Sequence, residues 1–413
     1  MRPGPQVVCA SALGQAQPVT HPSRLLTGRF LLICIASSLY FMGLNLTLSV
    51  LPLFVKEDLG GTSTQVGLAV GSFGVAAAMV RPIAGSIGDR RGRRTLIMGG
   101  ALIAGLATAM LALANSISAV VAMRMLAGFG EAGMFVGAAS AIQDLSPDDR
   151  RGEAASYFSL TIYGSVALGP PLGEFVANHW STDTTWLLAG ALAITASLVG
   201  STAPGPPEQP PAQSGRRTFL HRAAIRPGIV MFLGLLGYTS FLAFAAVHAE
   251  EIGISNTGTV FTVFAAVVLI LRIVAARLPD RLGPILTTRI SLSFGIAGLL
   301  TLWAWRTPTG VYFGAATIAV AQTFLFPALF ALVVDTAPDE ERSHAIGSFS
   351  MFFDLAFGIG GPTIGIVADA TDRPTGFLVA AVVAAVALVA SGRIIGDATP
   401  ATMVADIGPR SRR

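Results

Sequence analysis

The sequence predicts an all-α integral membrane protein whose twelve transmembrane helices form two related bundles of six. The first observation is composition: 53% of the 413 residues are hydrophobic and 12% are charged, whereas a soluble chain is roughly a quarter charged. The second is a series of apolar segments, and the third is an internal repeat. The composition excludes an ordinary soluble domain, and it excludes a disordered chain because disorder requires few apolar residues.

Each apolar segment is close to the length that a membrane-crossing helix needs, which is about 20 residues. Six segments occupy the first half of the chain, at 29–54, 65–86, 95–114, 118–143, 153–176 and 184–203. Six more occupy the second half, at 225–249, 257–277, 286–305, 311–334, 345–368 and 376–396. The proline-containing residues before the first segment have no long apolar run, so they predict a tail rather than a signal peptide.

A polar, proline-rich stretch with several arginines separates the two sets of segments, which is the pattern of a linker. The sequence therefore predicts two bundles joined by a linker and flanked by tails. The expected parts are a cytoplasmic tail at 1–24, an N-terminal bundle at 25–203, a cytoplasmic linker at 204–224, a C-terminal bundle at 225–396 and a cytoplasmic tail at 397–413.

The positions of the basic residues predict the orientation. Arginines gather in the N-terminal tail, the central linker, the C-terminal tail and every even-numbered connection, whereas the odd-numbered connections hold only Lys56, Arg306 and Arg373. Cytoplasmic loops carry an excess of Lys and Arg. We therefore expect a multi-pass protein of the inner (plasma) membrane with both termini in the cytoplasm. The small net charge of +4 indicates loop charge and no nucleic-acid partner.

The two halves share polar residues at a constant offset of 191 positions. The matched pairs include Arg81 and Arg272, Asp89 and Asp280, Arg90 and Arg281, Asp144 and Asp335, and Arg151 and Arg342. Chance matches of Ala or Leu are expected in membrane helices, but matched charges in loops are not. Two related bundles can rock against each other about a midplane site. The repeat therefore favours a transporter over a channel or a membrane enzyme.

The connection after the second segment reads Gly85-Ser86-Ile87-Gly88-Asp89-Arg90-Arg91-Gly92-Arg93-Arg94, and Asp280-Arg281-Leu282-Gly283 follows the eighth. The first run resembles the loop signature of the major facilitator superfamily, G-x-x-x-D-R-x-G-R-R, and the second is its weaker copy. The resemblance covers residues 25 to 396 and implies the major facilitator fold. It also implies a conformational latch, formed by Gly85, Asp89, Arg90, Gly92, Arg93, Asp280 and Arg281.

Two further patterns resemble those of proton-coupled drug and metabolite antiporters in this superfamily. Arg124 to Gly130 is similar to R-x-x-q-G-x-g, with Ala127 at the usual Gln position. Ser165 to Glu174 is similar to g-x-x-x-G-P-x-x-G-G, with Glu174 in place of the last glycine. The second pattern implies helix bending at Gly169, Pro170 and Gly173. A similar Gly-Pro run in the eleventh segment leaves symmetric bending as the alternative to export direction.

Few charges fall inside the apolar segments, where each is expensive and must face protein or a water-filled cavity. Glu131 and Asp354 lie near the middle of their segments, and Arg124 lies two helical turns from Glu131. We predict that these three residues couple transport to protons. The alternative is a static buried ion pair. Arg81 and Arg272 lie near predicted cytoplasmic ends, where we expect them to reach the interface rather than contact substrate.

By analogy with the family, the first, fourth, seventh and tenth segments line a substrate cavity. The candidates are aromatic or apolar side chains with a few hydrogen-bonding groups: Tyr40, Asn45, Phe129, Met134, Tyr238, Phe241, Gln322 and Phe326. This set suits a lipophilic, drug-like molecule better than a polyol. Core packing is the alternative explanation for each aromatic residue.

Together these features predict a secondary active transporter that exports a small lipophilic drug or metabolite in exchange for protons. No catalytic triad, metal-ligand cluster or nucleotide-binding loop is present. We therefore expect a monomer that is not an enzyme, with no cofactor or metal and with the proton gradient as its energy source. Its partners are a small-molecule substrate and the lipid bilayer. The alternatives are a proton symporter or facilitator that imports a metabolite, and a non-transporting membrane sensor.

Overall fold

The computed structural model describes residues 25–147, 150–203, 205, 220–275, 278–337 and 342–394. Within these ranges the regular structure is entirely helical. The helices of the N-terminal half are α1 (Gly28–Glu57), α2 (Ser63–Arg91), α3 (Arg93–Ala109) with the short η1 (Met110–Leu113), α4 (Ile117–Asp144), α5 (Arg151–His179) and α6 (Thr182–Gly200). Those of the C-terminal half are α7 (Arg222–Glu251), α8 (Gly258–Val274), α9 (Leu278–Leu282), α10 (Pro284–Ala304), α11 (Pro308–Thr336), α12 (Arg342–Ala370) and α13 (Arg373–Ile394).

Apart from the single turn α9, the α-helices match the twelve predicted segments, so the predicted all-α architecture is confirmed. Among the described residues, ten helices are long and apolar enough to cross a membrane. The apolar α8 has only 17 residues, and α5 is long but diluted by small polar residues. The predicted tails and most of the predicted linker lie outside the described residues.

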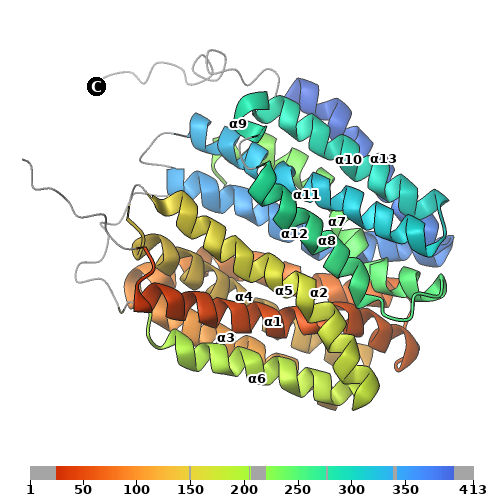
Figure 1. The fold of residues 1–413 in the computed structure, drawn as a ribbon, viewed down its shortest axis with the longest axis horizontal. Coiled ribbons are helices and arrows are strands. Elements are labelled where there is room, and N and C mark those ends of the chain that lie inside the picture. The colour runs from red at the N-terminus through yellow and green to blue at the C-terminus, as the bar shows by residue number, and fades with distance from the viewer. Residues whose placement is uncertain are drawn as a thin grey trace, which may run out of the picture.

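The helices form two layers, with α1 to α6 in one bundle and α7 to α13 in the other (Figure 1). Because successive long helices run in opposite directions, the α1–α2, α5–α6, α7–α8 and α12–α13 connections lie at one end of the molecule, on the right of Figure 1. We call this the distal end, because it lies away from the first and last described residues. We call the opposite end the terminal end.

Local sequence explains where the helices begin. At the distal end, α4, α6 and α11 each start after a Ser or Thr whose side chain accepts a backbone N–H of the first turn, and α2 has a full capping box of Thr62 and Gln65. At the terminal end, α3 and α10 start after Gly92 and Gly283, with φ of 85° and 77°. Glycine adopts such angles without strain. These two turns are one repeat apart, as the offset predicts.

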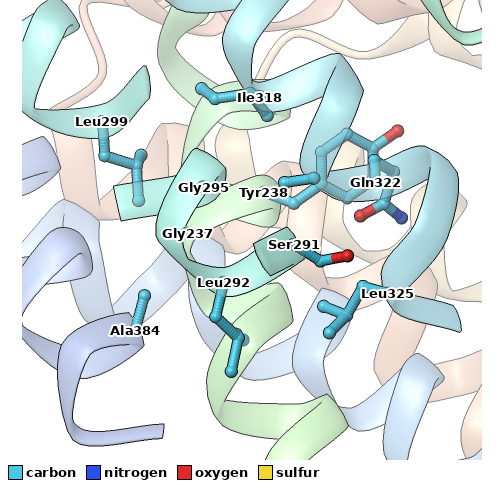
Figure 2. Close-up of a pocket in the computed structure, with 12 residues that line it drawn as sticks. Gly237, Tyr238, Ser291, Leu292, Gly295, Leu299, Ile318, Gln322, Leu325 and Ala384 are labelled. Carbon is cyan, nitrogen blue, oxygen red and sulfur yellow. The ribbon is translucent and has the colours of Figure 1, made fainter. Parts of the chain in front are cut away.

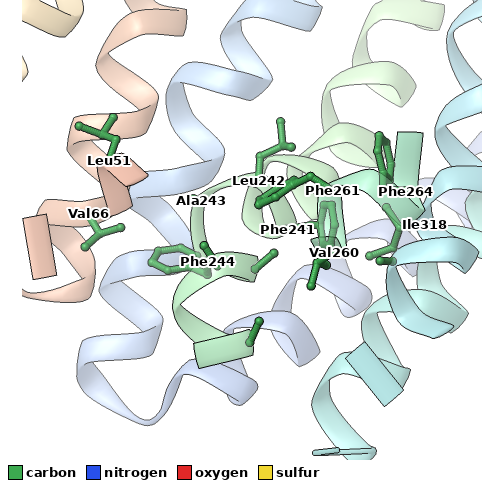
Figure 3. Close-up of a cluster of buried hydrophobic side chains, with 14 of the residues drawn as sticks. Leu51, Val66, Phe241, Leu242, Ala243, Phe244, Val260, Phe261, Phe264 and Ile318 are labelled. Carbon is green, nitrogen blue, oxygen red and sulfur yellow. The ribbon is translucent and has the colours of Figure 1, made fainter. Parts of the chain in front are cut away.

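Among the described residues, three buried apolar clusters hold the fold together, and one of the three joins the two bundles. It combines Leu51 of α1 and Val66 of α2 with Phe241 and Phe244 of α7 and Phe261 of α8 (Figure 3). All five lie in the distal parts of their helices. Because burial of apolar surface stabilises contact, this cluster closes the distal end of the molecule.

A seam of glycines brings α2 and α12 into backbone contact at the same end. A Cβ atom on Gly67 would lie 2.5 Å from the carbonyl carbon of Gly361 and 2.8 Å from the nitrogen of Pro362. One on Gly71 would lie 2.5 Å from the carbonyl oxygen of Gly358. Small residues allow this approach between membrane helices. The seam therefore needs glycine at these positions.

We expect Gly67→Ala to loosen the distal end. Its methyl group would meet backbone rather than a flexible side chain, and such overpacking costs about 1–3 kcal/mol. In a chain with Cys9 and Cys34 replaced, a Val66→Cys reporter should react with an impermeant maleimide about fivefold faster or more. Gly164→Ala is the matched control, because a Cβ there meets nothing within 4 Å. Equal reactivity in the two variants would contradict the close-packed seam.

Candidate functional site

A buried arginine lies between two buried carboxylates near the centre of the molecule. Nη2 of Arg81 is 3.4 Å from Oε2 of Glu131, and its Nε is 2.7 Å from Oδ2 of Asp354. The exposed fractions of the three side chains are 13%, 9% and 6%. The contact with Asp354 is an ion pair without the alignment of a hydrogen bond. We call these three residues the charged triad.

The charged triad crosses the interface between the bundles. Arg81 comes from α2 and Glu131 from α4, both in the first bundle, whereas Asp354 comes from α12 in the second. At 1.5 Å per residue, Glu131 lies about 20 Å from the distal start of α4, so the triad is deep within the helical bundles. A movement of one bundle against the other must stretch or break the Arg81–Asp354 pair.

Aromatic rings surround the charges. The Arg81 guanidinium lies 4.8 Å from the ring centroid of Phe135, within cation–π range. Beside Asp354 in α12, the rings of Phe353 and Phe357 stack at 4.8 Å, and Phe326 meets Phe353 edge-on at 5.9 Å. Such walls lower the local dielectric, which strengthens each charge interaction and raises the cost of any unpaired charge.

The charge balance of the triad is uneven. When both carboxylates are ionised, one guanidinium faces two negative groups, which leaves one uncompensated negative charge among aromatic rings. A proton on either carboxylate makes the group neutral. The arrangement can therefore hold or release one proton, with Arg81 free to favour the carboxylate that remains ionised.

A second arginine, at the equivalent position of the repeat, also contacts the other bundle, and the partners of this arginine are neutral. Arg272 of α8 donates from Nη1 to Oγ of Ser159 at 3.0 Å and from Nη2 to the hydroxyl of Tyr163 at 3.4 Å. Its guanidinium lies 4.6 Å from the Tyr163 ring centroid. Arg272 and Tyr163 stand one repeat offset from Arg81 and Asp354. Of these two arginines that reach the other bundle, only Arg81 has carboxylate partners among the described residues.

Two expectations about charged residues differ from the structure. Glu131 pairs with Arg81 rather than with Arg124, whose Nε donates to the carbonyl of Ala69 at 3.3 Å and whose guanidinium lies 4.5 Å from the Phe73 ring centroid. The expectation that Arg81 reaches the membrane interface is wrong, because its side chain is buried between helices. Spacing along α4 shows that Glu131 and Arg124 share a face, but it does not identify the side chain that arrives from α2.

The predicted latch is described only in part. The surroundings of Gly85 and the side chains of Asp89, Arg90 and Asp280 lie outside what the structure describes. Gly92 forms the turn between α2 and α3, Nε of Arg93 lies 3.1 Å from Oδ2 of Asp144, and Arg281 is exposed at the end of α9. The latch stays a prediction.

The glycines predicted to bend α5 lie against α1. A Cβ on Gly169 would come within 2.7 Å of the Asn45 side chain, and one on Gly173 would collide with the carbonyl of Leu46. Pro170 lies inside the helix, and its carbonyl accepts a hydrogen bond from Ser49 at 3.1 Å. The motif therefore permits close packing of α5 on α1. Whether it also bends the helix during a cycle stays a prediction.

The predicted substrate cavity stays a prediction. Tyr40 and Met134 are buried in the core of the first bundle, Phe241 is buried in the cluster that joins the two bundles, and Asn45 donates to Ser165 at 3.2 Å. Phe129 is half-buried. Phe326 lies near the charged triad through its contact with Phe353, and Tyr40 is close enough to Glu131 to feel its charge.

The remaining two candidates, Tyr238 and Gln322, line a pocket inside the second bundle (Figure 2). The pocket is small, with a volume of about 20 Å³, and its wall comes from α7, α10, α11 and α13. Glycines at 234, 237 and 295 leave this space because they have no side chains to fill it. Tyr238 also touches the aromatic group at Asp354, since its ring meets Phe357 edge-on at 5.7 Å.

Sequence reasoning missed Arg81 and the aromatic residues Phe135, Phe353 and Phe357 as parts of the site. One signal for Arg81 was available, because the repeat retains arginine at 81 and 272, within the last turns of two equivalent apolar segments. The aromatic residues gave no signal, since 24 phenylalanines are spread through the chain.

Comparisons of this chain with a family model and with known proteins agree on one family. A model of the Major Facilitator Superfamily matches residues 33–320 and again 229–405. An uncharacterized MFS-type transporter of Salmonella typhimurium is 31% identical over 361 residues, which cover 84% of this chain and 92% of the relative. One from Burkholderia pseudomallei strain K96243 is 28% identical over 355 residues, covering 84% and 86%.

Solved structures show the same fold at low sequence identity. The nucleoside transporter NupG aligns with a TM-score of 0.74 and 17% identity over 89% of this chain and 99% of that one. A POT family transporter aligns with a TM-score of 0.76 and 13% identity over 90% and 96%. A bacterial homologue of the lysosomal transporter Spinster aligns with a TM-score of 0.70 and 16% identity over 93% and 98%.

Proposed function

Because the chain belongs to the major facilitator superfamily of membrane transporters, we propose that it exports a small lipophilic molecule in exchange for protons. The observation that carries the proposal is the charged triad at the interface between the bundles. A single buried arginine faces two carboxylates there, and one of them belongs to the opposite bundle. Proton binding and bundle movement therefore act on the same contacts.

The coupling follows from the charge balance. With a proton on Glu131 or Asp354, the triad is neutral and compatible with its aromatic surroundings. After the proton leaves, the extra negative charge is costly unless a cation or water offsets it, or unless Asp354 moves away with its bundle. A positively charged or electron-poor substrate meets the same need. Since proton and substrate each relieve one charge, binding of one weakens binding of the other, which is the requirement of antiport.

The direction of transport rests on the arginine distribution. Arginines on the even-numbered connections and tails favour a cytoplasmic terminal end, so the distal end faces outward. The distal cluster and glycine seam then keep the structure closed to the outside. Such a state accepts substrate from the cytoplasmic side, as an exporter must before it turns over. Partly exposed aromatic rings near Asp354 suit a flat lipophilic molecule.

A proton-release assay in everted membrane vesicles tests this function. Vesicles are energised to an acidic interior and monitored with acridine orange, and a panel of lipophilic compounds is then added. An exporter should release protons when its substrate is added, so one or more compounds should restore the dye fluorescence in vesicles that contain the protein and not in empty-vector vesicles.

Other outcomes separate the rival functions. A symporter would accumulate compound only when the gradient is reversed, and a facilitator would equilibrate it equally after a protonophore is added. A sensor would bind compound without moving it. Each of these results would contradict proton-coupled export.

A further inference from the structure

A carboxylate from one bundle caps a helix of the other at the distal end. Thr257 precedes α8 in a helical conformation and gives that helix no side-chain cap of its own. Glu174 of α5 takes this place, because it accepts a hydrogen bond from the Thr257 hydroxyl and lies close enough for its charge to interact with the backbone N–H groups of Thr257 and Gly258. Ser49 of α1, whose hydroxyl donates to the carbonyl of Pro170, also lies beside this carboxylate. A negative charge at a helix N-terminus interacts favourably with the helix dipole.

A carboxylate of the second bundle makes an equivalent contact with a helix of the first bundle. Oδ1 of Asp369, at the end of α12, accepts the backbone N–H of Ser63 at 2.7 Å, and its Oδ2 accepts that of Thr64 at 2.8 Å. These two N–H groups belong to the first turn of α2. The repeat relates α5 to α12 and α2 to α8, so each bundle offers one carboxylate to the helix N-terminus of its neighbour. We call the pair the distal clasp.

The two halves of the distal clasp differ in burial. Asp369 is exposed, whereas Glu174 is 5% exposed. Close backbone packing surrounds Glu174, because a Cβ on Gly258 would lie 2.6 Å from the carbonyl carbon of Pro170. Nearby, the Thr262 hydroxyl of α8 donates to the carbonyl of Ala167 of α5 at 2.7 Å. A charge in this position depends almost wholly on the donors that α8 provides.

Other charged groups lie on the same distal rim. Glu250 of α7 is close enough to feel the charges of Glu174 and of Glu57 of α1. Glu251 of α7 pairs with Lys56 of α1 at 3.5 Å and with Arg373 of α13. The groups that interact with Glu174, which are Ser49 of α1 and Thr257 and Gly258 at the start of α8, are uncharged. The buried charge of Glu174 therefore has only these neutral groups to stabilise it among the described residues.

We propose that Glu174 is a second proton site, separate from the charged triad, whose ionised form holds the distal end closed. Proton binding turns one carboxylate oxygen from an acceptor into a donor and removes the charge that attracts the start of α8. The charge-assisted hydrogen bonds then weaken, and α8 separates from α5. Asp369, exposed to solvent, stays ionised and keeps α2 in place until the second bundle moves. Acid outside the cell therefore favours opening toward the outside.

Distance measurement across the distal end tests this proposal. Spin labels on cysteines at Asn178 and Asn256, both exposed, report the separation of α5 from α8, in protein lacking Cys9 and Cys34 and held in lipid nanodiscs. At mildly alkaline pH, Glu174→Gln should raise the ratio of open to closed molecules about tenfold, since hydrogen bonds to a charged group are stronger than those to a neutral one. Acidification should bring the wild type to the same ratio and leave the variant unchanged.

Three further variants make the result specific. Thr257→Ala removes one donor and keeps the charge, so it should open the distal end less and retain the response to pH. Asp369→Asn should also retain that response, because Glu174 is intact. Glu131→Gln should retain it as well, which separates this proposal from the proposed coupling at the triad. A closed Glu174→Gln protein at alkaline pH, or a Glu174→Gln protein with the full wild-type response to pH, would overturn the assignment.

Discussion

Glu131→Gln is expected to abolish proton-driven accumulation while leaving exchange of substrate intact. The change removes the titratable oxygen but keeps the size of the side chain and a carbonyl that can accept from Arg81. The triad then has one positive and one negative group and is neutral without a proton. In everted vesicles, the compound that restores acridine orange fluorescence most strongly should accumulate at least about tenfold more slowly under a pH gradient. Exchange of labelled for unlabelled compound without a gradient should continue.

Asp354→Asn is the matched comparison for this prediction. It removes the other carboxylate of the triad, and with it the ion pair that crosses between bundles. We expect a similar loss of proton-driven accumulation, together with slower exchange because the inter-bundle contact itself is altered. Full gradient-driven accumulation in Glu131→Gln would show that the transported proton binds elsewhere.

Arg81→Gln should be the most destabilising single change in the charged triad. It leaves two carboxylates buried among aromatic rings with no cation between them. Breaking a buried ion pair by removing one partner costs about 3–5 kcal/mol. The purified variant in detergent should unfold at a clearly lower temperature than the wild type, as measured by the fluorescence of a thiol-reactive dye that labels Cys34 on unfolding.

Arg272→Gln is the control, because it stands at the equivalent position of the repeat and has neutral partners in Ser159 and Tyr163. Its loss should cost less, since no buried charge is left unpaired. The double variant Arg81→Gln, Asp354→Asn should recover part of the lost stability by removing one carboxylate. Equal destabilisation by Arg81→Gln and Arg272→Gln would contradict the charge balance described for the triad.

Sequence periodicity predicted the helices well, for a physical reason. A membrane-crossing helix must satisfy its backbone hydrogen bonds internally and needs about 20 apolar residues. A local stretch of sequence therefore determines where such a helix begins and ends. The helices α1 to α8 and α10 to α13 accordingly match the predicted segments within a few residues. The repeat also identified Gly92 and Gly283 as equivalent turns.

The partners across the interface could not be predicted in the same way. Glu131 and Asp354 were selected because charge is rare in apolar helices, but the residue between them comes from α2, and no local pattern links these three helices. Arg81 was assigned to the membrane interface because it lies near the end of an apolar segment. The structure shows that the neighbouring bundle covers that position. Inter-bundle contact depends on the packing of helices far apart in sequence, which spacing within one helix does not contain.

Glu174 illustrates the opposite case. In the sequence, Glu174 stands where the antiporter pattern has its last glycine, so it weakens the match to that pattern. In the structure the same side chain caps α8 of the other bundle. A residue that breaks a motif can therefore mark a contact that this chain makes.

Competition between proton and substrate for the charged triad is the step on which the proposed export depends. Its most direct test is to add the transported compound to purified wild-type protein in weakly buffered detergent solution and to follow the pH with an indicator dye. Compound binding should release protons from the wild type and none from the double variant Glu131→Gln, Asp354→Asn. Equal proton release from both proteins, or proton uptake on binding, would contradict this competition.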